Sequence, residues 1–345
     1  MKDWKSVLKA DSTEWLLEKE NPSVRYFTLT QLLDQPENHV EVKQTKSDIM
    51  KVGVVPEILT KMAEPAYWEN SKKFYTDKYR GLVWQLVILA ELGADVSAGD
   101  PGGAEGYGNE IRKACEFLLE NSQDRESGGF SMSASAKSGG GRHSEVIPCL
   151  TGNLVWSLLR LGYGEDPRIQ RGIDWIINFQ RFDDGAGEAP QGWPYDKYEM
   201  CWGKHTCHMG VVKSLKALAE IPSSQRTQRI RGTIEKGAEY LLIHHIHKRS
   251  HNLNQVSRPG WLRFSFPLMY QTDILEILEI LTRLGYRDPR MEEAITKVIS
   301  KQDTQGRWLM VNTFNGRFLE DIEEKDQPSK WLTLRALMVL KRWYQ

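Results

Sequence analysis

The passage Leu161-Gly162-Tyr163-Gly164-Glu165-Asp166-Pro167-Arg168 has a near copy further along the chain, in Leu284-Gly285-Tyr286-Arg287-Asp288-Pro289-Arg290. In both passages an apolar helical pattern stops at the Gly, and an Asp followed by Pro precedes the next helical pattern. Glycine often ends a helix because it accepts the left-handed conformation, and Asp before Pro is a common helix start. The repeated passage therefore predicts helical hairpins with short connections.

On either side of these connections, two kinds of helical segment alternate along the chain. Apolar residues recur at three- and four-residue spacing throughout, while the period-two alternation of strands is rare. The first kind has a polar or aromatic beginning and a Leu-rich tail, and comprises residues 23–33, 79–92, 150–161, 206–218, 272–284 and 330–340. The second kind is amphipathic and comprises residues 109–120, 167–179, 228–243 and 289–300. Amphipathic helices suit a solvent-facing layer. We therefore expect an all-α fold, an α/α toroid of about six helical hairpins with the Leu-rich helices inside, built by residues 1–345 as a single domain.

Composition excludes several classes of protein. The 46 basic residues balance 46 acidic ones, so no net field favours nucleic acid or a charged membrane. No apolar run is long enough to span a bilayer, and the N-terminus lacks the apolar core of a signal peptide. Four cysteines are too few for a disulfide framework in a chain of this size. These features predict a cytoplasmic protein with reduced thiols, no membrane span and no nucleic-acid partner. Because no exposed helical docking motif stands out in the chain, we expect a monomer or homodimer.

Long stretches without helical periodicity adjoin the starts of the Leu-rich helices. They comprise residues 94–108, 122–148, 181–204, 248–267 and 308–328. Long loops in a compact domain are often functional. If the inner helices run parallel, these loops gather at one end of the ring, where we expect a polar and aromatic pocket for a small-molecule substrate.

Gln302-Asp303-Thr304-Gln305-Gly306-Arg307-Trp308 matches the Q-x-x-x-G-x-W repeat of squalene and oxidosqualene cyclases. Looser copies are Gln123 with Gly128-Gly129-Phe130, and Gln180 with Gly192-Trp193. A Gln side chain can cap helix ends while the aromatic ring stacks over the turn. The chain thus resembles the terpenoid cyclase and protein prenyltransferase superfamily, and in particular bacterial proteins with prenyltransferase or squalene-oxidase repeats.

This resemblance implies an α/α toroid and an isoprenoid-like substrate. The D-x-D-D acid of the cyclases is missing, since Phe182-Asp183-Asp184-Gly185 lacks its first Asp, so cyclisation by that route is not expected. Prenyltransferase β subunits bind zinc through Asp, Cys and His. The chain has these residue types, although not in that family's local pattern.

The densest group of reactive side chains is Cys201-Trp202-Gly203-Lys204-His205-Thr206-Cys207-His208, before the fourth inner helix. Cys149 begins the third inner helix, and Tyr270 and Asp273 begin the fifth. Cys149, His205, Cys207 and Asp273 could ligate zinc. The same set with Tyr270 could instead perform metal-free acid–base or nucleophilic chemistry. A third possibility is packing, because free Cys is often a small buried hydrophobe.

Aromatic and charged residues near the helix starts are candidates for substrate binding. The expected set is Lys78, Tyr79, Trp202, Trp308, Asn312, Arg317, Lys330 and Trp331. Aromatic faces hold cations or sugar rings, and the cationic residues could neutralise an anionic substrate. In the acidic run 320–325, at most one side chain is expected to reach the site, because charge runs usually face solvent.

Three functions remain open. The leading hypothesis is an enzyme with lyase, isomerase or transferase chemistry on a small apolar or isoprenoid-like substrate, which uses Cys149, His205, Cys207, Tyr270 and Asp273. The second is a carbohydrate-active hydrolase or lyase. Such hydrolases need two positioned carboxylates, and Asp273 with Glu320 or Asp321 could supply them. The third is a non-catalytic ligand-binding toroid.

Overall fold

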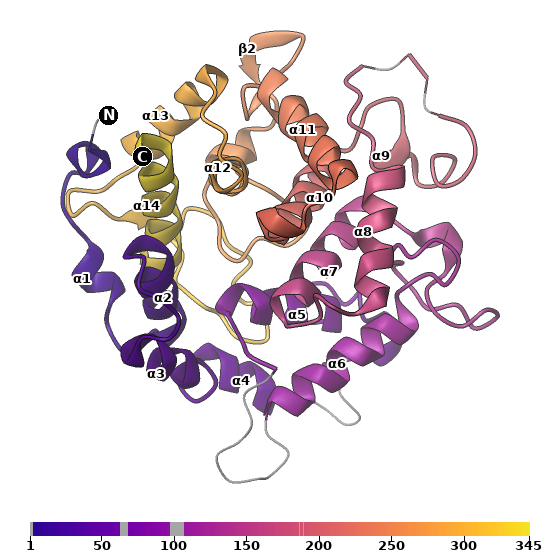
Figure 1. The fold of residues 1–345 in the computed structure, drawn as a ribbon, viewed down its shortest axis with the longest axis horizontal. Coiled ribbons are helices and arrows are strands. Elements are labelled where there is room, and N and C mark those ends of the chain that lie inside the picture. The colour runs from indigo at the N-terminus through magenta and orange to yellow at the C-terminus, as the bar shows by residue number, and fades with distance from the viewer. Residues whose placement is uncertain (1–2, 63–67, 97–106, 186, 189) are drawn as a thin grey trace. The chain divides into compact units, whose positions relative to one another are not determined.

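The computed structural model describes residues 3–62, 68–96, 107–185, 187–188 and 190–345 (Figure 1). Parts of two predicted loops, residues 97–106, 186 and 189, lie outside the described residues. The chain divides into two compact units. Unit 1 comprises residues 1–57, 241–268 and 272–345, and unit 2 comprises residues 58–240 and 269–271.

Unit 2 is a succession of helices (Figure 1). They are α5 (Leu82–Leu92), α6 (Tyr107–Asn121), α7 (Pro148–Arg160), α8 (Pro167–Phe179), α9 (Glu199–Trp202), α10 (His208–Glu220) and most of α11 (Gln228–Ile243), with short 3-10 turns at Ser71–Lys73, His143–Glu145 and Ser223–Gln225. Helix α7 packs against α10, α5 and α8, and α5 packs against α6. Helices α5, α7 and α10 are almost completely buried, whereas α6 and α8 bury one side only.

Unit 1 holds the remaining elements. Its helices are α1 (Thr13–Leu16), α2 (Pro22–Phe27), α3 (Val40–Ile49), α12 (Ile274–Arg283), α13 (Glu292–Ser300) and α14 (Lys330–Tyr344), with α4 (Val54–Thr60) crossing the unit boundary, a π-turn at Thr28–Leu32 and 3-10 turns at Trp4–Val7, Pro259–Leu262 and Pro289–Met291. Two small antiparallel ribbons pair β1 (Lys248–Arg249) with β2 (Asn252–Val256) and β3 (Trp308–Leu309) with β4 (Pro328–Ser329). Helix α14 packs against α12 and α2, and α12 and α14 are buried along most of their length.

The predicted elements are confirmed. The six Leu-rich segments form α2 with its π-turn, α5, α7, α10, α12 and α14, and the amphipathic segments form α6, α8, α11 and the 3-10 turn with α13. Gly162 and Gly285 both adopt positive φ, at 90° and 89°. The following Asp166 and Asp288 accept hydrogen bonds from the backbone N–H of Arg168 and Arg290. The predicted class, all-α with the helical hairpins of an α/α toroid, is therefore confirmed, while the single-domain boundary 1–345 stays a prediction.

The glutamines of the three motifs join one hairpin to another, as expected. Gln123 Nε2 donates to the carbonyls of Gly128 and Arg168, at 2.9 and 2.7 Å. Gln302 Nε2 donates to Val7 O at 3.1 Å, and its Oε1 accepts from Lys9 N at 3.0 Å. Gln180 Oε1 accepts from Ser214 Oγ at 3.0 Å.

The motif aromatics are fixed by the next inner helix. The backbone N–H of Phe130 donates to Thr151 Oγ1 in α7, and that of Trp308 donates to Thr333 Oγ1 in α14, both at 3.0 Å. Trp308 also donates through Nε1 to Val298 O and is fully buried. Trp308 therefore holds the turn together, and its expected substrate-binding role gains no support.

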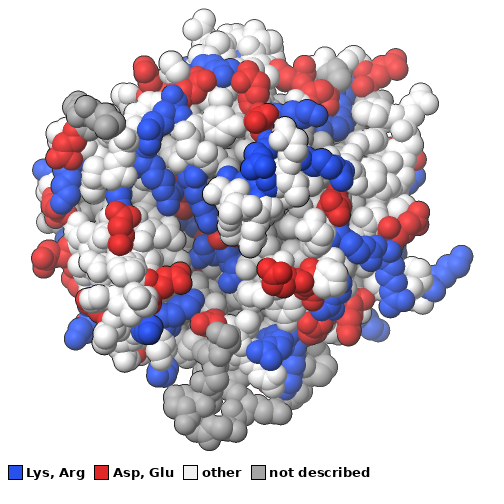
Figure 2. All heavy atoms as spheres, viewed as in Figure 1, with Lys and Arg blue, Asp and Glu red and all other residues white. Residues whose placement is uncertain are grey.

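Surface charge and hydropathy agree with the composition. Basic and acidic side chains alternate over the visible face, without a large field of one sign (Figure 2). Among the described residues, no helix has both the length and the apolar character that a bilayer span requires.

Candidate functional site

The predicted site residues fall into different units. Unit 2 contains Lys78, Tyr79, Cys149, Trp202, His205, Cys207 and Tyr270, and unit 1 contains Asp273, Trp308, Asn312, Arg317, Lys330 and Trp331. Asp273 thus belongs to a different unit from the three other proposed zinc ligands. In the described part of the chain, no three His, Cys, Asp or Glu side chains are gathered so that they could hold a metal ion. The zinc site gains no support from this geometry and stays a prediction.

Three thiols lie near one another at the helix starts of unit 2. Burial raises the pKa of Cys149 well above its usual range, and the nearby Cys207 and Cys201 raise it further. Burial followed by Cys207 raises the pKa of Cys201 to about 12. The lowering expected at a helix N-terminus is thus outweighed by desolvation. Thiols of this kind are protonated at neutral pH and are poor nucleophiles, so a thiolate mechanism at Cys149 is not favoured.

Tyr79 and Tyr270 are brought together in unit 2, as predicted. Tyr79 makes side-chain hydrogen bonds with Gln271 and Tyr270, and burial raises its pKa. Lys78 Nζ lies 5.5 Å from the centre of the Tyr270 ring, and the Trp84 ring lies 6.1 Å from it, edge to face. An aromatic and polar cluster therefore forms where α5 begins.

Trp202 and His205 have other surroundings. Trp202 is buried against Trp175 and Tyr195, with ring centres 5.9 and 5.3 Å away, and the Arg181 guanidinium binds its carbonyl. His205 is exposed. These contacts favour a packing role for Trp202.

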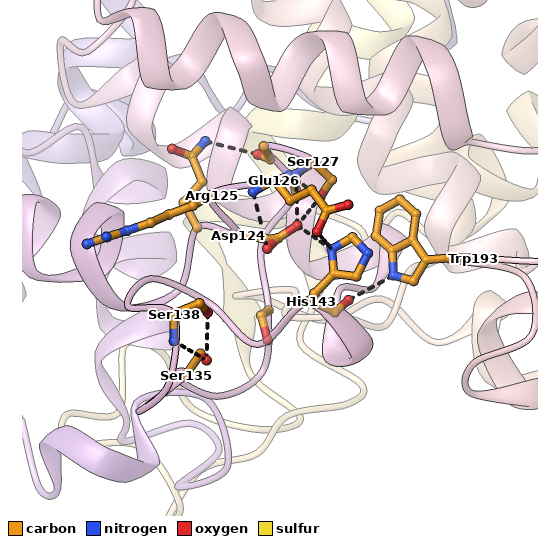
Figure 3. Close-up of polar contacts among 12 residues, drawn as sticks. Asp124, Arg125, Glu126, Ser127, Ser135, Ser138, His143 and Trp193 are labelled. Atoms are coloured by element: carbon orange, nitrogen blue, oxygen red, sulfur yellow. Dashed lines mark hydrogen bonds and ion pairs between the residues drawn. The ribbon is translucent and has the colours of Figure 1, made fainter.

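An Asp–His pair that the sequence did not indicate lies within the predicted functional loop 122–148 (Figure 3). His143 Nδ1 lies 2.8 Å from Asp124 Oδ2. The Asp124 side chain is buried, and it also accepts from the Ser127 hydroxyl and N–H at 2.5 and 2.9 Å. Although burial opposes it, the hydrogen bonds from Ser127 and His143 lower the pKa of Asp124. The Asp124 carboxylate therefore orients the imidazole through Nδ1.

Trp193 covers this imidazole. Its ring stacks on His143 with centres 4.1 Å apart and planes 11° apart, and its Nε1 donates to His143 O at 2.9 Å (Figure 3). Loops 122–148 and 181–204 thus meet in unit 2, as expected for loops that gather near inner-helix starts. The sequence signal was an Asp directly after a motif Gln, which alone did not indicate the distant His143.

Two carboxyl groups stand out in unit 1, at the starts of α12 and α14. Asp273 is buried and caps α12, with Oδ1 accepting from Glu276 N at 2.9 Å and Oδ2 from Ser265 N at 3.2 Å. Glu323 caps α14, with Oε1 accepting from Trp331 N at 3.2 Å and Oε2 from the Ser329 hydroxyl. Burial raises the pKa of each group to about 7, against these hydrogen bonds.

A continuous set of contacts links the two carboxyls. Ser265, whose N–H binds Asp273, precedes Phe266, which stacks flat on Trp331 with ring centres 4.5 Å apart. Trp331 in turn donates its N–H to Glu323. The Arg335 guanidinium lies 4.9 Å from the Phe266 ring centre. The starts of α12 and α14 are thereby fixed relative to each other within unit 1.

The other predicted residues of unit 1 surround this arrangement. Lys330 Nζ pairs with Glu18 at 2.6 Å and lies 5.5 Å from the Trp15 ring centre. Asn312 donates its backbone N–H to Phe264 O at 3.1 Å, and Arg317 is exposed. In the acidic run 320–325, the enclosed carboxyl is Glu323, whereas Asp321 is exposed and accepts from Gly316 N. Asp273 is thus joined to Glu323 through Ser265, Phe266 and Trp331, whereas the expected partner was Glu320 or Asp321.

Comparisons with known proteins correct the resemblance drawn from the motifs. No family model matches the sequence. No curated protein matches it either. A similar solved structure is a family 76 glycoside hydrolase from a bovine Bacteroides thetaiotaomicron strain, at 11% identity and a TM-score of 0.49, over 94% of this chain and 67% of that one.

The predicted membership of the terpenoid cyclase and prenyltransferase superfamily is therefore wrong, and the isoprenoid-like substrate is withdrawn with it. The physical reason lies in the motif itself. Gln302 and Trp308 bond helix ends and a backbone carbonyl, which is a way to join helical hairpins whatever the chemistry of the protein.

Proposed function

We propose that this chain is a carbohydrate-active hydrolase, with Glu323 and Asp273 as its acid–base pair. The observation that carries this proposal is the pair of enclosed carboxyls at the starts of α12 and α14, both with a pKa raised to about 7. By contrast, hydrogen bonds lower the pKa of six other described carboxyls, which are Asp11, Asp124, Asp166, Asp183, Asp288 and Glu293. The proposal rests on the two carboxyls alone and not on the likeness to the family 76 hydrolase.

A raised pKa is what glycosidic cleavage requires of its acid. Hydrolysis of a glycosidic bond needs a proton on the leaving oxygen and a carboxylate that activates water or attacks the sugar carbon. A carboxyl with a pKa near 7 keeps part of its population protonated at neutral pH. Glu323 retains some exposed surface whereas Asp273 is buried, so we assign Glu323 as the proton donor to the substrate.

The proton balance is then simple. Glu323 gives its proton to the glycosidic oxygen, the bond between that oxygen and the sugar carbon breaks, and water adds to the carbon. The ionised Asp273 accepts the proton that this water loses. Resetting the pair needs only a proton exchange with solvent, so no cofactor enters the reaction.

Glycan hydrolysis by the intact chain tests the proposal. Oligosaccharides with different linkages are incubated with the wild type and with Glu323→Gln, Asp273→Asn and Glu324→Gln, and reducing ends are counted. Acid–base groups contribute about 10²- to 10⁴-fold to rate, so the first two variants should lose at least about 100-fold in kcat/KM. Glu324 is an exposed neighbour in the same acidic run, and its variant should keep full activity.

Fold must be checked alongside activity, because both carboxyls cap helices. Asn and Gln retain a carbonyl oxygen that can accept a capping bond, so far-UV circular dichroism of the variants should match the wild type. Wild-type activity in Glu323→Gln, or no cleavage of any linkage by the wild type, would count against the proposal.

A further inference from the structure

Unit 2 contains buried amide oxygens that have no hydrogen-bond donor. Gln85 in α5 and Asn153 in α7 are 0% and 1% exposed, and Gln85 Oε1 and Asn153 Oδ1 are both without a partner. A third such oxygen is Gln271 Oε1. Buried polar atoms are nearly always satisfied in folded proteins, so three in one unit indicate donors supplied from outside the chain.

The orientation of two of these amides is fixed. Gln85 Nε2 donates to Tyr79 O at 2.6 Å, and Asn153 Nδ2 donates to Met269 O at 3.2 Å. Turning either amide over would bring its oxygen against a carbonyl oxygen. The unpaired oxygens therefore face away from these carbonyls and need N–H or O–H groups.

The three oxygens belong to one neighbourhood. Gln85 bonds the backbone of Tyr79, and Tyr79 bonds the side chains of Tyr270 and Gln271. Asn153 bonds the backbone of Met269, next to Tyr270 in the chain. Helices α5 and α7, which carry Gln85 and Asn153, pack against each other. The three amide side chains therefore lie around the segment 269–271.

The surroundings restrict the chemistry of a ligand. Lys78 lies over the Tyr270 ring, and Lys213 is close enough to Cys149 to lower its pKa against the effect of burial. Two cations disfavour a cationic ligand, although such a ligand could also donate hydrogen bonds. The partly exposed ring of Tyr270 offers aromatic surface of the kind that packs on the C–H face of a sugar. A neutral ring with several hydroxyls satisfies all of these conditions.

We propose that Gln85, Asn153 and Gln271, with Tyr79 and Tyr270, form a binding site for a neutral sugar ring. The ligand's hydroxyls donate to the three amide oxygens, and one of its faces lies on an aromatic ring. This assignment shares its ligand class with the proposed function and deepens it in that respect. It does not depend on the carboxyl pair, because binding can be measured without turnover.

The test is calorimetric titration of the full chain with methyl glucoside, methyl mannoside and methyl galactoside. Glucosamine serves as the cationic comparison, and cyclohexanol as a ring with one hydroxyl. At least one neutral glycoside should bind, and at least tenfold more tightly than glucosamine or cyclohexanol. Gln85→Met and Asn153→Leu should each weaken that binding at least tenfold, while Gln170→Met, an exposed Gln in α8, should leave it unchanged.

A second measurement keeps the test decisive if the buried variants fold poorly. In the wild type labelled with ¹⁵N, the side-chain amide signals of Gln85 and Asn153 should shift as the glycoside saturates. The proposal is overturned if no neutral glycoside binds, if cyclohexanol binds as tightly, or if both amide signals stay unchanged at saturation.

The two proposals fail separately. A chain that binds the glycoside but cleaves no glycan refutes the hydrolase and leaves this site standing. A chain that cleaves glycans with no dependence on Gln85 or Asn153 refutes this site and leaves the carboxyl pair standing.

Discussion

The buried carboxyl of Asp273 makes the stability of the chain depend on pH in a direction opposite to that of most carboxylates. Its pKa is about 7 in the fold and about 3.8 in its ordinary state. Between these values the folded chain holds a proton that the unfolded chain releases. The free energy of unfolding therefore falls as pH rises through this window. Below about pH 3.8 the group is neutral in both states, and above about pH 7 the full cost of the buried charge is present.

The magnitude follows from the shift. About three pKa units at about 1.4 kcal/mol each give a cost of up to about 4 kcal/mol for the ionised group. Replacing Asp273 by Asn removes this cost but places an NH₂ group against a backbone N–H, either that of Ser265 or that of Glu276. A lost bond of this kind costs about 1–3 kcal/mol. Asp273→Asn should therefore be less stable than the wild type at pH 4.5 and equally or more stable at pH 8.

Urea denaturation of both proteins at half-unit steps from pH 4.5 to 8 measures this difference. Other groups titrate in the same range, including Glu323 in the same direction and His247, whose pKa burial lowers, in the opposite one. Because these groups are present in both proteins, the stability gap between wild type and variant isolates Asp273. A suitable control is Asp288→Asn, since the Arg290 hydrogen bond lowers the pKa of Asp288 to about 2. The difference in stability between the wild type and this variant should therefore be constant above pH 5. A gap for Asp273→Asn that changes by less than about 0.5 kcal/mol would refute the reasoning.

Three further predictions concern unit 2 and use urea denaturation. Gly152→Ala should lower the free energy of unfolding by about 1–3 kcal/mol, because a Cβ there would lie 2.4 Å from a backbone carbon of α10. Its control is Gly232→Ala, which has open space around it. As a helical Gly-to-Ala change, it should raise the free energy of unfolding by up to about 1 kcal/mol. Lys216→Met should lower the free energy of unfolding by about 3–5 kcal/mol, because it removes the cation 2.5 Å from the buried carboxylate of Glu91. The double variant Lys216→Met, Glu91→Gln should recover most of that loss. His143→Leu should lower the free energy of unfolding by about 2–4 kcal/mol through the missing bond to a carboxylate and the missing ring stack. A change below about 0.5 kcal/mol would show that His143 does not hold the loops 122–148 and 181–204 together.

Helix positions could be predicted from sequence where the pattern was dense. The segment that became α5 is buried along its whole length, and such a segment shows as an unbroken Leu-rich run. Helix α3 was not predicted, because its buried positions are few and include Thr45. A short helix with little apolar surface leaves a weak periodic signal. The same holds for β1 and β2, whose residues are largely exposed.

The candidate site was predictable only in part. Reactive residues were expected at inner-helix starts, and Asp273 does cap α12 while Tyr79 and Tyr270 are in contact. Their functional roles stay predictions. Glu323 was missed because its position depends on how a loop returns to α14, where Ser329 and Trp331 bind its two oxygens. Sequence spacing within an acidic run does not reveal which side chain meets a helix start. Gln85 and Asn153 were visible as polar residues inside apolar helices, but their unpaired oxygens appear only in three dimensions.

The contrast among capping carboxylates supports a proton-transfer role for Asp273. Asp166 and Asp288 also accept backbone N–H bonds at helix starts, and their arginine partners lower their pKa. Asp273 makes bonds of the same kind, yet burial raises its pKa to about 7. Serine, threonine or asparagine would cap α12 without the cost of burying a titratable carboxyl. A buried carboxyl at this position, joined by contacts to a second one with the same displaced pKa, is therefore better explained by the proton it can exchange than by the helix it caps.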